Sequence, residues 1–329
     1  MTRFGYTLMT EQSGPKQLVS YARTAEQVGF DFEVSSDHYS PWLVEQGHAP
    51  YAWTTLGAVA QVTERVELMT YVTCPTLRYH PAVVAQKAAT LQILADGRFT
   101  LGLGAGESLN EHVVGRGWPS VATRHSMLAE AIDVIRSLHT GELVDHRGEY
   151  FQVDSARIWD VPDDGVDIAV AVSGDRSVDT FAPLADHLVA VEPDGELVDR
   201  WNATDGAPRI EAGGARAIGQ IPICWGPDAD EAKRVAHEQF RWFAGGWSVN
   251  ADLPTPAGFA GASQYVTPDD VAASIPCGPD LDAIVEAIVP FFKAGFTDVA
   301  VVQVGDASQE AFLREAAGPL LEKLRDASA

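Results

Sequence analysis

Short apolar runs alternate along the chain with longer stretches in which apolar residues recur every three or four positions. Runs of the first kind are typical of buried β-strands, and stretches of the second kind are typical of amphipathic helices. The strand-like run at 4–8 precedes a helical stretch that begins near Pro15 and stops before Gly29, a residue suited to the C′ position of a helix. Eight strands are predicted in all, at 4–8, 30–36, 66–72, 99–106, 166–172, 187–192, 217–225 and 298–304.

Helical stretches of suitable length separate many of these strands, as at 123–139, where apolar residues form one stripe. Eight βα units close most naturally into a (β/α)8 TIM-like barrel, whose active site lies where the strands end. An open doubly wound sheet is the alternative, but the first strand lacks the GxGxxG turn of a dinucleotide domain. We expect one barrel domain over 1–329, with long insertions at about 38–52, 141–165 and 242–280.

The composition indicates a globular protein with an acidic surface, since 46% of the 329 residues are apolar and the formal net charge is −23. Nucleic acid and anionic membranes are disfavoured as partners, because both require a basic face. The acidity fits adaptation to high salt and a GC-rich genome equally well. The first residues lack the apolar core of a signal peptide, and no stretch reaches the ~18 apolar residues of a membrane span. We expect a cytoplasmic protein that acts on a small molecule.

The cysteines show no metal or disulfide pattern. Cys74, Cys224 and Cys277 are odd in number, lie far apart and lack CxxC spacing. This pattern favours reduced core thiols over a disulfide framework or a zinc site. No metal site is expected.

Polar, chemically capable side chains follow the predicted strands. Those after the first, second and fourth strands are Glu11, Asp37, His38, Trp42, Glu107 and Asn110. Taken singly, Glu11 fits a helix cap, His38 fits a turn, and Glu107 fits the acidic start of a helix. A barrel brings all strand ends to one mouth, so we expect these residues to lie together.

Two glycine-containing stretches have separate interpretations. The stretch "GLGAGE" at 102–107 lacks the GK[ST] ending of a phosphate loop and is typical of a strand that passes close to something flat. In "VSGDRS" at 172–177, the backbone N–H groups of Ser173 and Gly174 open a helix and would suit a phosphate.

Four motifs in this order, "GYTLMTEQ" (5–12), "SDHYSPW" (36–42), "RYHPAVVAQ" (78–86) and "GAGESLNE" (104–111), resemble the luciferase-like flavin superfamily. The resemblance is to its branch built around the F420-dependent glucose-6-phosphate dehydrogenases. It is close over 1 to about 175 and in the last helix and strand, and weak from about 190 to 280. It implies a TIM-like barrel that holds the deazaflavin coenzyme F420, a hydride carrier, and a homodimer.

The resemblance also assigns roles to individual residues. It implies that His38 transfers the substrate proton, that Trp42 lies beside it, that Glu107 is a second acid or base, and that Glu11 supports them. Histidine titrates near neutrality and can take the proton of a carbinol as the hydride leaves. The positions implied to contact the cofactor are Asp37, Tyr71 and Val72 at a non-proline cis peptide, Cys74, Ala105, Gly106, Asn110, Ser173, Gly174, Arg176 and Ser177.

The substrate end departs from the branch. Where the sugar-phosphate enzymes have a threonine and three basic residues, this chain has Val191, Asp194, about Gly258 and about Ser274. Cys74 also replaces a usual threonine. The stretch "FRWFAGGW" at 240–247 is rich in aromatic residues and fits a cover over an apolar or neutral substrate, or ordinary packing, with Arg241 as one available cation.

We therefore expect hydride transfer between F420 and an alcohol or carbonyl carbon of a small molecule other than a sugar phosphate. Two alternatives remain open for catalysis: an F420H2-dependent reductase of an imine or activated alkene, and an FMN-dependent monooxygenase of the same fold. A binding barrel without turnover is disfavoured by the intact set of acids, histidine and tryptophan.

Overall fold

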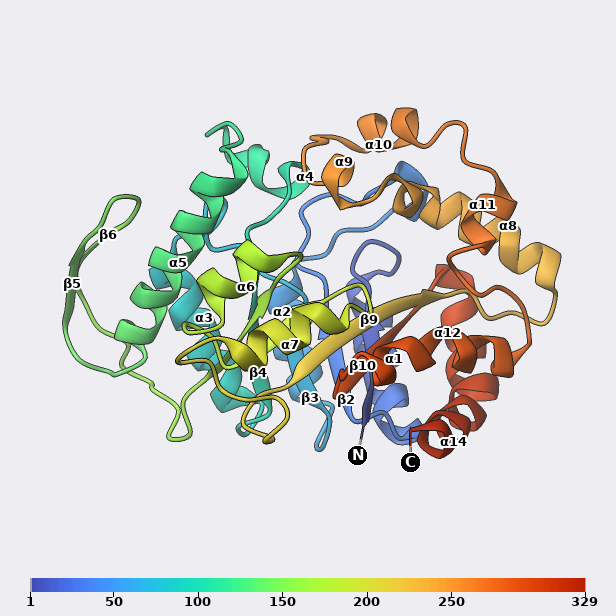
Figure 1. Cartoon of the computed structure of the whole chain (residues 1–329), viewed down its shortest axis with the longest axis horizontal. Helices are drawn as coiled ribbons and strands as arrows, with labels where there is room; N and C mark the ends of the chain where they lie inside the picture. Colours follow the sequence, from blue (N-terminus) through green and yellow to red (C-terminus); the bar gives the residue numbers. More distant parts are fainter. Residues whose placement is uncertain (1, 329) are drawn as a thin grey trace.

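Eight parallel strands form the centre of the molecule (Figure 1), in the computed structural model that describes residues 2–328. The terminal residues 1 and 329 of the expected domain lie outside the described range. The strands close into a barrel in the order β1-β10-β9-β8-β7-β4-β3-β2, which confirms the TIM-like barrel. They are β1 (Arg3–Leu8), β2 (Phe32–Ser35), β3 (Glu67–Thr70), β4 (Phe99–Leu103), β7 (Asp167–Ala171), β8 (His187–Ala190), β9 (Ala217–Ile223) and β10 (Asp298–Gln303). Each lies within its predicted run, apart from one extra residue at the start of β1.

Helices cover the outside of the barrel. The longer ones are α1 (Pro15–Val28), α2 (Ala52–Ala60), α3 (Pro81–Leu94), α5 (Val121–Leu138), α6 (Asp175–Phe181), α7 (Gly195–Ala203), α8 (Ala229–Phe240), α12 (Leu281–Lys293) and α14 (Ala317–Ala327). Gly29 ends α1 with a φ of 113°, as its predicted C′ position requires. No helix within residues 2–328 is both long and apolar enough to span a bilayer.

Short helical turns complete the connections between the longer elements. They are α4 (Ser108–Glu111), α9 (Trp247–Asn250), α10 (Pro256–Ala262), α11 (Pro268–Ala272), α13 (Gln309–Ala311), the 3-10 turns η1 (Val44–Gln46), η2 (His112–Val114), η3 (Arg241–Gly245) and η4 (Asp306–Ser308), and the π-helical η5 (Phe312–Ala316). Several of them lie at one end of the barrel, above the carboxyl ends of the strands (Figure 1).

Two apolar layers hold the barrel together. The interior layer consists of Phe32, Val34, Met69, Ala169, Val189, Ile218 and Ala300, which alternate along their strands with residues that face the helices. The outer layer joins strands to helices and contains fully buried aromatic side chains such as Tyr6 and Phe291. Gly102 in β4 is required by close packing, because a Cβ there would lie 1.8 Å from the Thr70 carbonyl oxygen. The strands read as apolar runs because both of their faces are buried.

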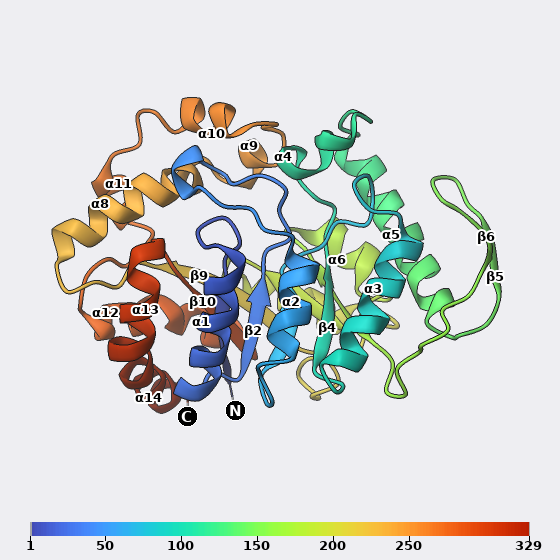
Figure 2. The same ribbon diagram turned by 180° about the vertical axis from the view of Figure 1, so that it is seen from behind.

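The three predicted insertions have different structures. The first, 38–52, is a loop that contains η1 and leads to α2. The second, 141–165, contains an antiparallel hairpin of β5 (Val144–Arg147) and β6 (Gln152–Ala156), which projects away from the barrel (Figure 2). The third lies across the carboxyl ends of the strands (Figure 1), and we call residues 241–277, with η3, α9, α10 and α11, the roof segment.

Candidate active site

The carboxyl ends of β1, β2, β3 and β4 bring four loops to one mouth. β1 leads to Glu11 and β2 to Asp37 and His38, while β4 leads to Glu107 at the start of α4. Parallel pairing fixes this convergence, because Leu8 of β1 pairs with Ser35 of β2 and the neighbouring strands continue the register. The predicted gathering of strand-end residues is therefore present in the structure.

His38 lies between two carboxylates. Its Nδ1 is 2.5 Å from Glu11 Oε1, and its Nε2 is 3.5 Å from Glu107 Oε1. The first contact is ionic in character, because Nδ1 is out of line for a hydrogen bond. Glu11 is 1% exposed and accepts a hydrogen bond from the Ser36 hydroxyl at 2.6 Å. Glu11 therefore contacts the histidine instead of capping α1, whose N-cap is Gly14.

These neighbours change the acidity of both partners. Burial alone would lower the pKa of His38, but Glu11 and, more weakly, Glu107 raise it to about 9. Burial alone would raise the pKa of Glu11, but His38 and Ser36 bring it below its ordinary value. In the protein without ligand the two acids thus hold the pKa of His38 above the near-neutral value typical of histidine, because they approach it closely, which the sequence does not show.

The ion pair has a consequence for stability. The pKa of His38 is about 9 in the folded protein and near its ordinary 6.5 in the unfolded chain. The folded state therefore retains a proton that the unfolded chain loses, and the stabilisation disappears as the pH rises from about 6.5 to 9. The free energy of unfolding should fall by on the order of 3 kcal/mol across this window, as measured by urea unfolding. In His38→Gln this part of the pH dependence should vanish, and parallel slopes for the two proteins would contradict the ion pair.

An aromatic stack lies beside His38. The Trp42 ring meets the imidazole edge-on, with centroids 5.0 Å apart. Trp242 of the roof segment stacks on the other side of Trp42 at 4.1 Å and an interplanar angle of 10°, and Phe259 packs edge-on against both indoles. Trp42 is buried, so the stack separates His38 from solvent on this side. The predicted neighbourhood of His38 and Trp42 is confirmed.

The roof segment is also joined to the mouth by polar contacts. Ser108 at the start of α4 donates its backbone N–H to the Ala251 carbonyl at 2.9 Å, and Trp118 donates to Asp252 at 2.8 Å. Arg241 donates to the Glu45 carboxylate at 2.8 Å and to the Glu238 carbonyl at 2.8 Å. The cation that the sequence offered to a substrate is therefore engaged within the protein.

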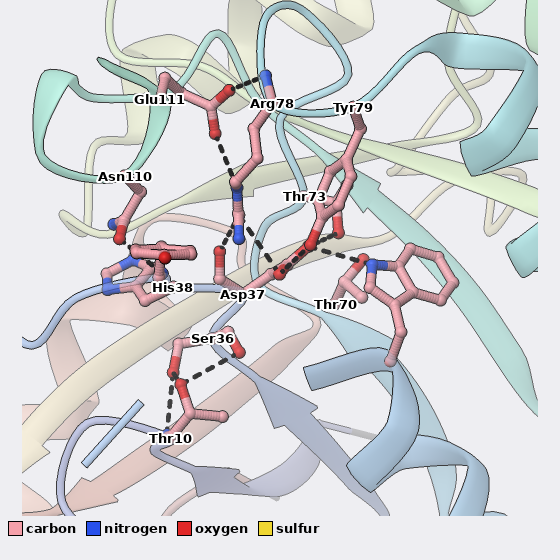
Figure 3. Close-up of polar contacts among 12 residues, drawn as sticks. Thr10, Ser36, Asp37, His38, Thr70, Thr73, Arg78, Tyr79, Asn110 and Glu111 are labelled. Carbon is pink, nitrogen blue, oxygen red and sulfur yellow. Dashed lines mark hydrogen bonds and ion pairs between the residues drawn. The ribbon is translucent and has the colours of Figure 1, made fainter. Parts of the chain in front are cut away.

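Asp37 lies at the centre of a buried hydrogen-bond network (Figure 3). One carboxylate oxygen accepts from Trp53 Nε1 at 3.0 Å and from the Thr73 hydroxyl at 2.7 Å. The other accepts from the Tyr79 hydroxyl at 3.0 Å and from Arg78 Nη2 at 3.3 Å. The bonds of these four donors to Asp37 were not predicted from the sequence, although two of the donors belong to the motif "RYHPAVVAQ". Asp37 stabilises the loop that carries His38, and its contact with a cofactor stays a prediction.

Asn110 ties α4 to the same loop. Its Oδ1 accepts hydrogen bonds from the backbone N–H groups of Tyr39 at 2.7 Å and Ser40 at 2.9 Å. Its Nδ2 donates to Glu107 Oε1 at 2.5 Å. Asn110 thus orients the Glu107 carboxylate that faces His38, a role the sequence did not indicate.

A closely packed strip runs along the ends of β3 and β4. The Tyr71–Val72 peptide is cis, as the resemblance implied. A Cβ on Gly104 would lie 2.6 Å from Val72 Cγ2, and one on Gly106, whose φ is 78°, would lie 2.5 Å from Cys74 Sγ. The strip is therefore limited to glycine at both positions, because the segments after β3 and β4 pack closely there.

The last predicted group lies at the end of β7 and the start of α6. The backbone N–H groups of Ser173 and Gly174 both point to the Ser177 hydroxyl, at 3.1 and 3.2 Å. Arg176 is exposed on the outer surface of α6. These residues are not joined to the His38 cluster by the contacts described above, and the Ser177 hydroxyl takes the donors that the sequence offered to a phosphate. Their role toward a cofactor stays a prediction.

Known proteins are similar to this chain in sequence. Over 334 residues the chain is 35% identical to the F420-dependent glucose-6-phosphate dehydrogenase of Amycolatopsis mediterranei (strain U-32), covering 99% of each chain. Over 187 residues it is 45% identical to the protein of the same name from Nakamurella multipartita, covering 57% of this chain and 55% of that one.

Solved structures show the same architecture. An F420-dependent secondary alcohol dehydrogenase in complex with an F420-acetone adduct superimposes with a TM-score of 0.87 at 27% identity, over 100% of this chain and 99% of that one. The coenzyme F420-dependent tetrahydromethanopterin reductase from Methanopyrus kandleri shares the fold, with a TM-score of 0.71 at 18% identity over 95% and 98% of the chains. The family model described as luciferase-like monooxygenase matches residues 1–298. The chain therefore belongs to the luciferase-like monooxygenase family.

Proposed function

We propose that this protein is a coenzyme F420-dependent oxidoreductase that transfers a hydride between the deazaflavin and the alcohol or carbonyl carbon of a small uncharged molecule. The observation that carries the proposal is the placement of His38 between Glu11 and Glu107 at the strand ends, beside Trp42. The cofactor is supported by the names of the relatives, which include F420-dependent dehydrogenases for both sugar phosphates and secondary alcohols.

The strip along β3 and β4 fits a flat ring. Val72, Gly104, Ala105 and Gly106 form a closely packed strip, in which neither glycine position has room for a Cβ. Val72 and Ala171 pack against the apolar barrel interior beneath it. A bound deazaflavin would supply two-electron hydride chemistry, and the protein would supply binding, orientation and proton management.

His38 manages the proton. In alcohol oxidation, neutral His38 would take the hydroxyl proton at Nε2, and Glu11 beside Nδ1 would stabilise the resulting imidazolium. In the opposite direction, the imidazolium would donate that proton to the carbonyl oxygen. A pKa of about 9 keeps His38 protonated at neutral pH in the protein without ligand, and this is the form that can donate a proton to a carbonyl oxygen. The alternative of an F420H2-dependent reductase of a carbonyl, imine or activated alkene is supported by this observation.

The proposed uncharged substrate differs from glucose 6-phosphate, the substrate in the names of the curated relatives. Two residues at the expected phosphate positions argue for the difference. Val191 is 51% exposed and apolar, and Asp194 is an acid whose carboxylate caps α7 through the Glu196 N–H at 2.9 Å. A phosphate dianion requires cationic or multiple N–H donors, which neither residue supplies. The aromatic stack of Trp42 and Trp242 instead suits an apolar molecule.

Titration separates the deazaflavin from the FMN alternative. We expect the purified protein to quench F420 fluorescence with a dissociation constant in the micromolar range or below, about −8 kcal/mol, and to bind FMN much more weakly. The two cofactors are to be titrated in parallel under the same conditions. Tight binding of FMN together with undetectable binding of F420 would overturn the assignment and favour a monooxygenase.

A further inference from the structure

A buried arginine, Arg78, lies among the acids of the mouth. Arg78 belongs to the connection between β3 and α3, and its side chain is only 8% exposed. Its guanidinium lies between Asp37 and Glu111 (Figure 3) and covers the Tyr79 ring at 4.5 Å. The proposed mechanism assigns no role to this buried cation.

The hydrogen bonds of Arg78 reach two separate segments. Toward the loop after β2, Nη2 donates to the Asp37 carbonyl at 2.5 Å and to its carboxylate at 3.3 Å. Toward α4, Nε donates to Glu111 Oε1 at 3.3 Å and the backbone N–H donates to Glu111 Oε2 at 2.8 Å. The first segment carries His38 in the next position, and the second carries Glu107 four residues earlier. Arg78 therefore bridges the two proton-handling groups without touching either through a hydrogen bond.

We propose that Arg78 is a positioning residue that fixes the loop of His38 against α4 and so sets the spacing between His38 and Glu107. The inference rests on the proposed function, because it concerns the residues assigned to the proton. Asn110 holds the same two segments on the other side of the His38 position, through Tyr39, Ser40 and Glu107. His38 thus sits between two bridges, of which only Arg78 is charged.

The charge of Arg78 acts on the same groups. The charged groups that face His38 are Glu11 from the loop after β1, Glu107 from the start of α4, and Arg78 from the loop after β3. Arg78 opposes the two acids and lowers the pKa of His38. Burial raises the pKa of Glu111 to about 7, and the bonds from Arg78 oppose that rise. Removing the cation should therefore favour protonation of His38.

The shape of arginine matters as well as its charge. A guanidinium has five donors in a planar fork and can serve two acceptors in different directions, whereas an ammonium is a point charge. Arg78→Lys keeps the charge and loses the bridge, and Arg78→Gln loses the charge and keeps two donors. Comparison of the two variants therefore separates the effect of the spacing between His38 and Glu107 from the effect of the charge of Arg78.

Two measurements on the full chain test the proposal. The first is turnover with F420 and an uncharged alcohol, where we expect both variants to lose roughly 10- to 100-fold in kcat with little change in F420 affinity. The second is NMR titration of the His38 imidazole in the protein without cofactor. We expect the midpoint to rise by about one pH unit in Arg78→Gln and to stay close to the unmodified protein in Arg78→Lys.

Arg98 supplies the matched control. It is part-buried, donates to the carbonyls of Ala60, Thr63 and Val66, and contributes to the opposite end of the barrel. Arg98→Lys should lower stability without changing kcat or the His38 titration. If Arg98→Lys reproduces the losses of Arg78→Lys, the effect is general loosening and the proposal is wrong.

Three further results would contradict the proposal or the function on which it rests. Turnover within about twofold of normal in Arg78→Lys would overturn the proposal. Because Arg78→Lys keeps the buried positive charge, it still tests the proposal if Arg78→Gln does not fold. An unchanged His38 midpoint in a folded Arg78→Gln would overturn the electrostatic part. Full activity in His38→Ala would instead contradict the proposed function. The NMR titration of His38 in the Arg78 variants would still report whether Arg78 affects the pKa of His38.

Discussion

His38→Ala is expected to lower turnover by roughly 10²-fold or more, while F420 affinity changes little. The loss should fall on kcat, because the role proposed for the imidazole is proton exchange in the transition state, and the strip along β3 and β4 proposed to hold the cofactor stays intact. The ionic contact with Glu11 and the Trp42 edge contact hold the ring in place for this exchange. Steady-state kinetics with F420 and an alcohol, together with fluorescence titration, measure the two quantities.

His48 is a suitable control for this experiment, since it is exposed in the loop after η1. His48→Ala should keep normal turnover and normal affinity. If His38→Ala also keeps normal turnover, His38 is a structural residue of the turn and the proton must be handled elsewhere. If F420 binding disappears with turnover, the histidine belongs to the cofactor site.

Glucose 6-phosphate is expected to be used with a kcat/KM roughly 10³-fold or more below that of an uncharged secondary alcohol. Each charge-assisted hydrogen bond to a phosphate contributes about 1.5 to 3 kcal/mol, so three missing cations correspond to a factor of this size. Asp194 adds a negative charge near the expected site, and the net charge of −23 offers no compensating field. Rates of F420 reduction across a panel of alcohols measure the ratio.

Glucose itself provides the internal control for the phosphate group. An enzyme with a phosphate site should prefer glucose 6-phosphate to glucose by a large factor, whereas this protein should show no such preference. Saturable F420 reduction by glucose 6-phosphate at a millimolar or lower KM would show that the alignment of about 190–280 misplaced the phosphate positions. The protein would then share the substrate named for its curated relatives.

The strands of the barrel could be predicted because each is buried on both faces and reads as a continuous apolar run. The hairpin of β5 and β6 was not predicted as strands. Its residues Val144–Arg147 alternate between part-buried and exposed and carry two charges and a histidine, so the segment lacks an apolar signal. The roof segment was located only as an insertion, because its helices are short and only two of them, α10 and α11, begin at a Thr-Pro pair.

The strand-end residues Glu11, His38, Trp42 and Glu107 could be predicted to meet because barrel topology alone brings them together. The partners of Asp37 could not, since Trp53 and Thr73 approach it from different elements and no spacing in the chain records that approach. The raised pKa of His38 has the same cause, because it depends on distances of a few ångströms between loops. The homodimer implied by the resemblance stays a prediction.

The division of labour between two parts of the chain has an evolutionary consequence. All the residues proposed to handle the proton lie within the first third of the sequence, whereas Trp242, which stacks on Trp42, belongs to one continuous insertion between α8 and α12. Substitutions in that insertion can therefore alter the surroundings of Trp42 while the strand-end residues stay unchanged. Proteins that share this barrel can therefore differ in sequence within the insertion and still keep the same strand-end residues.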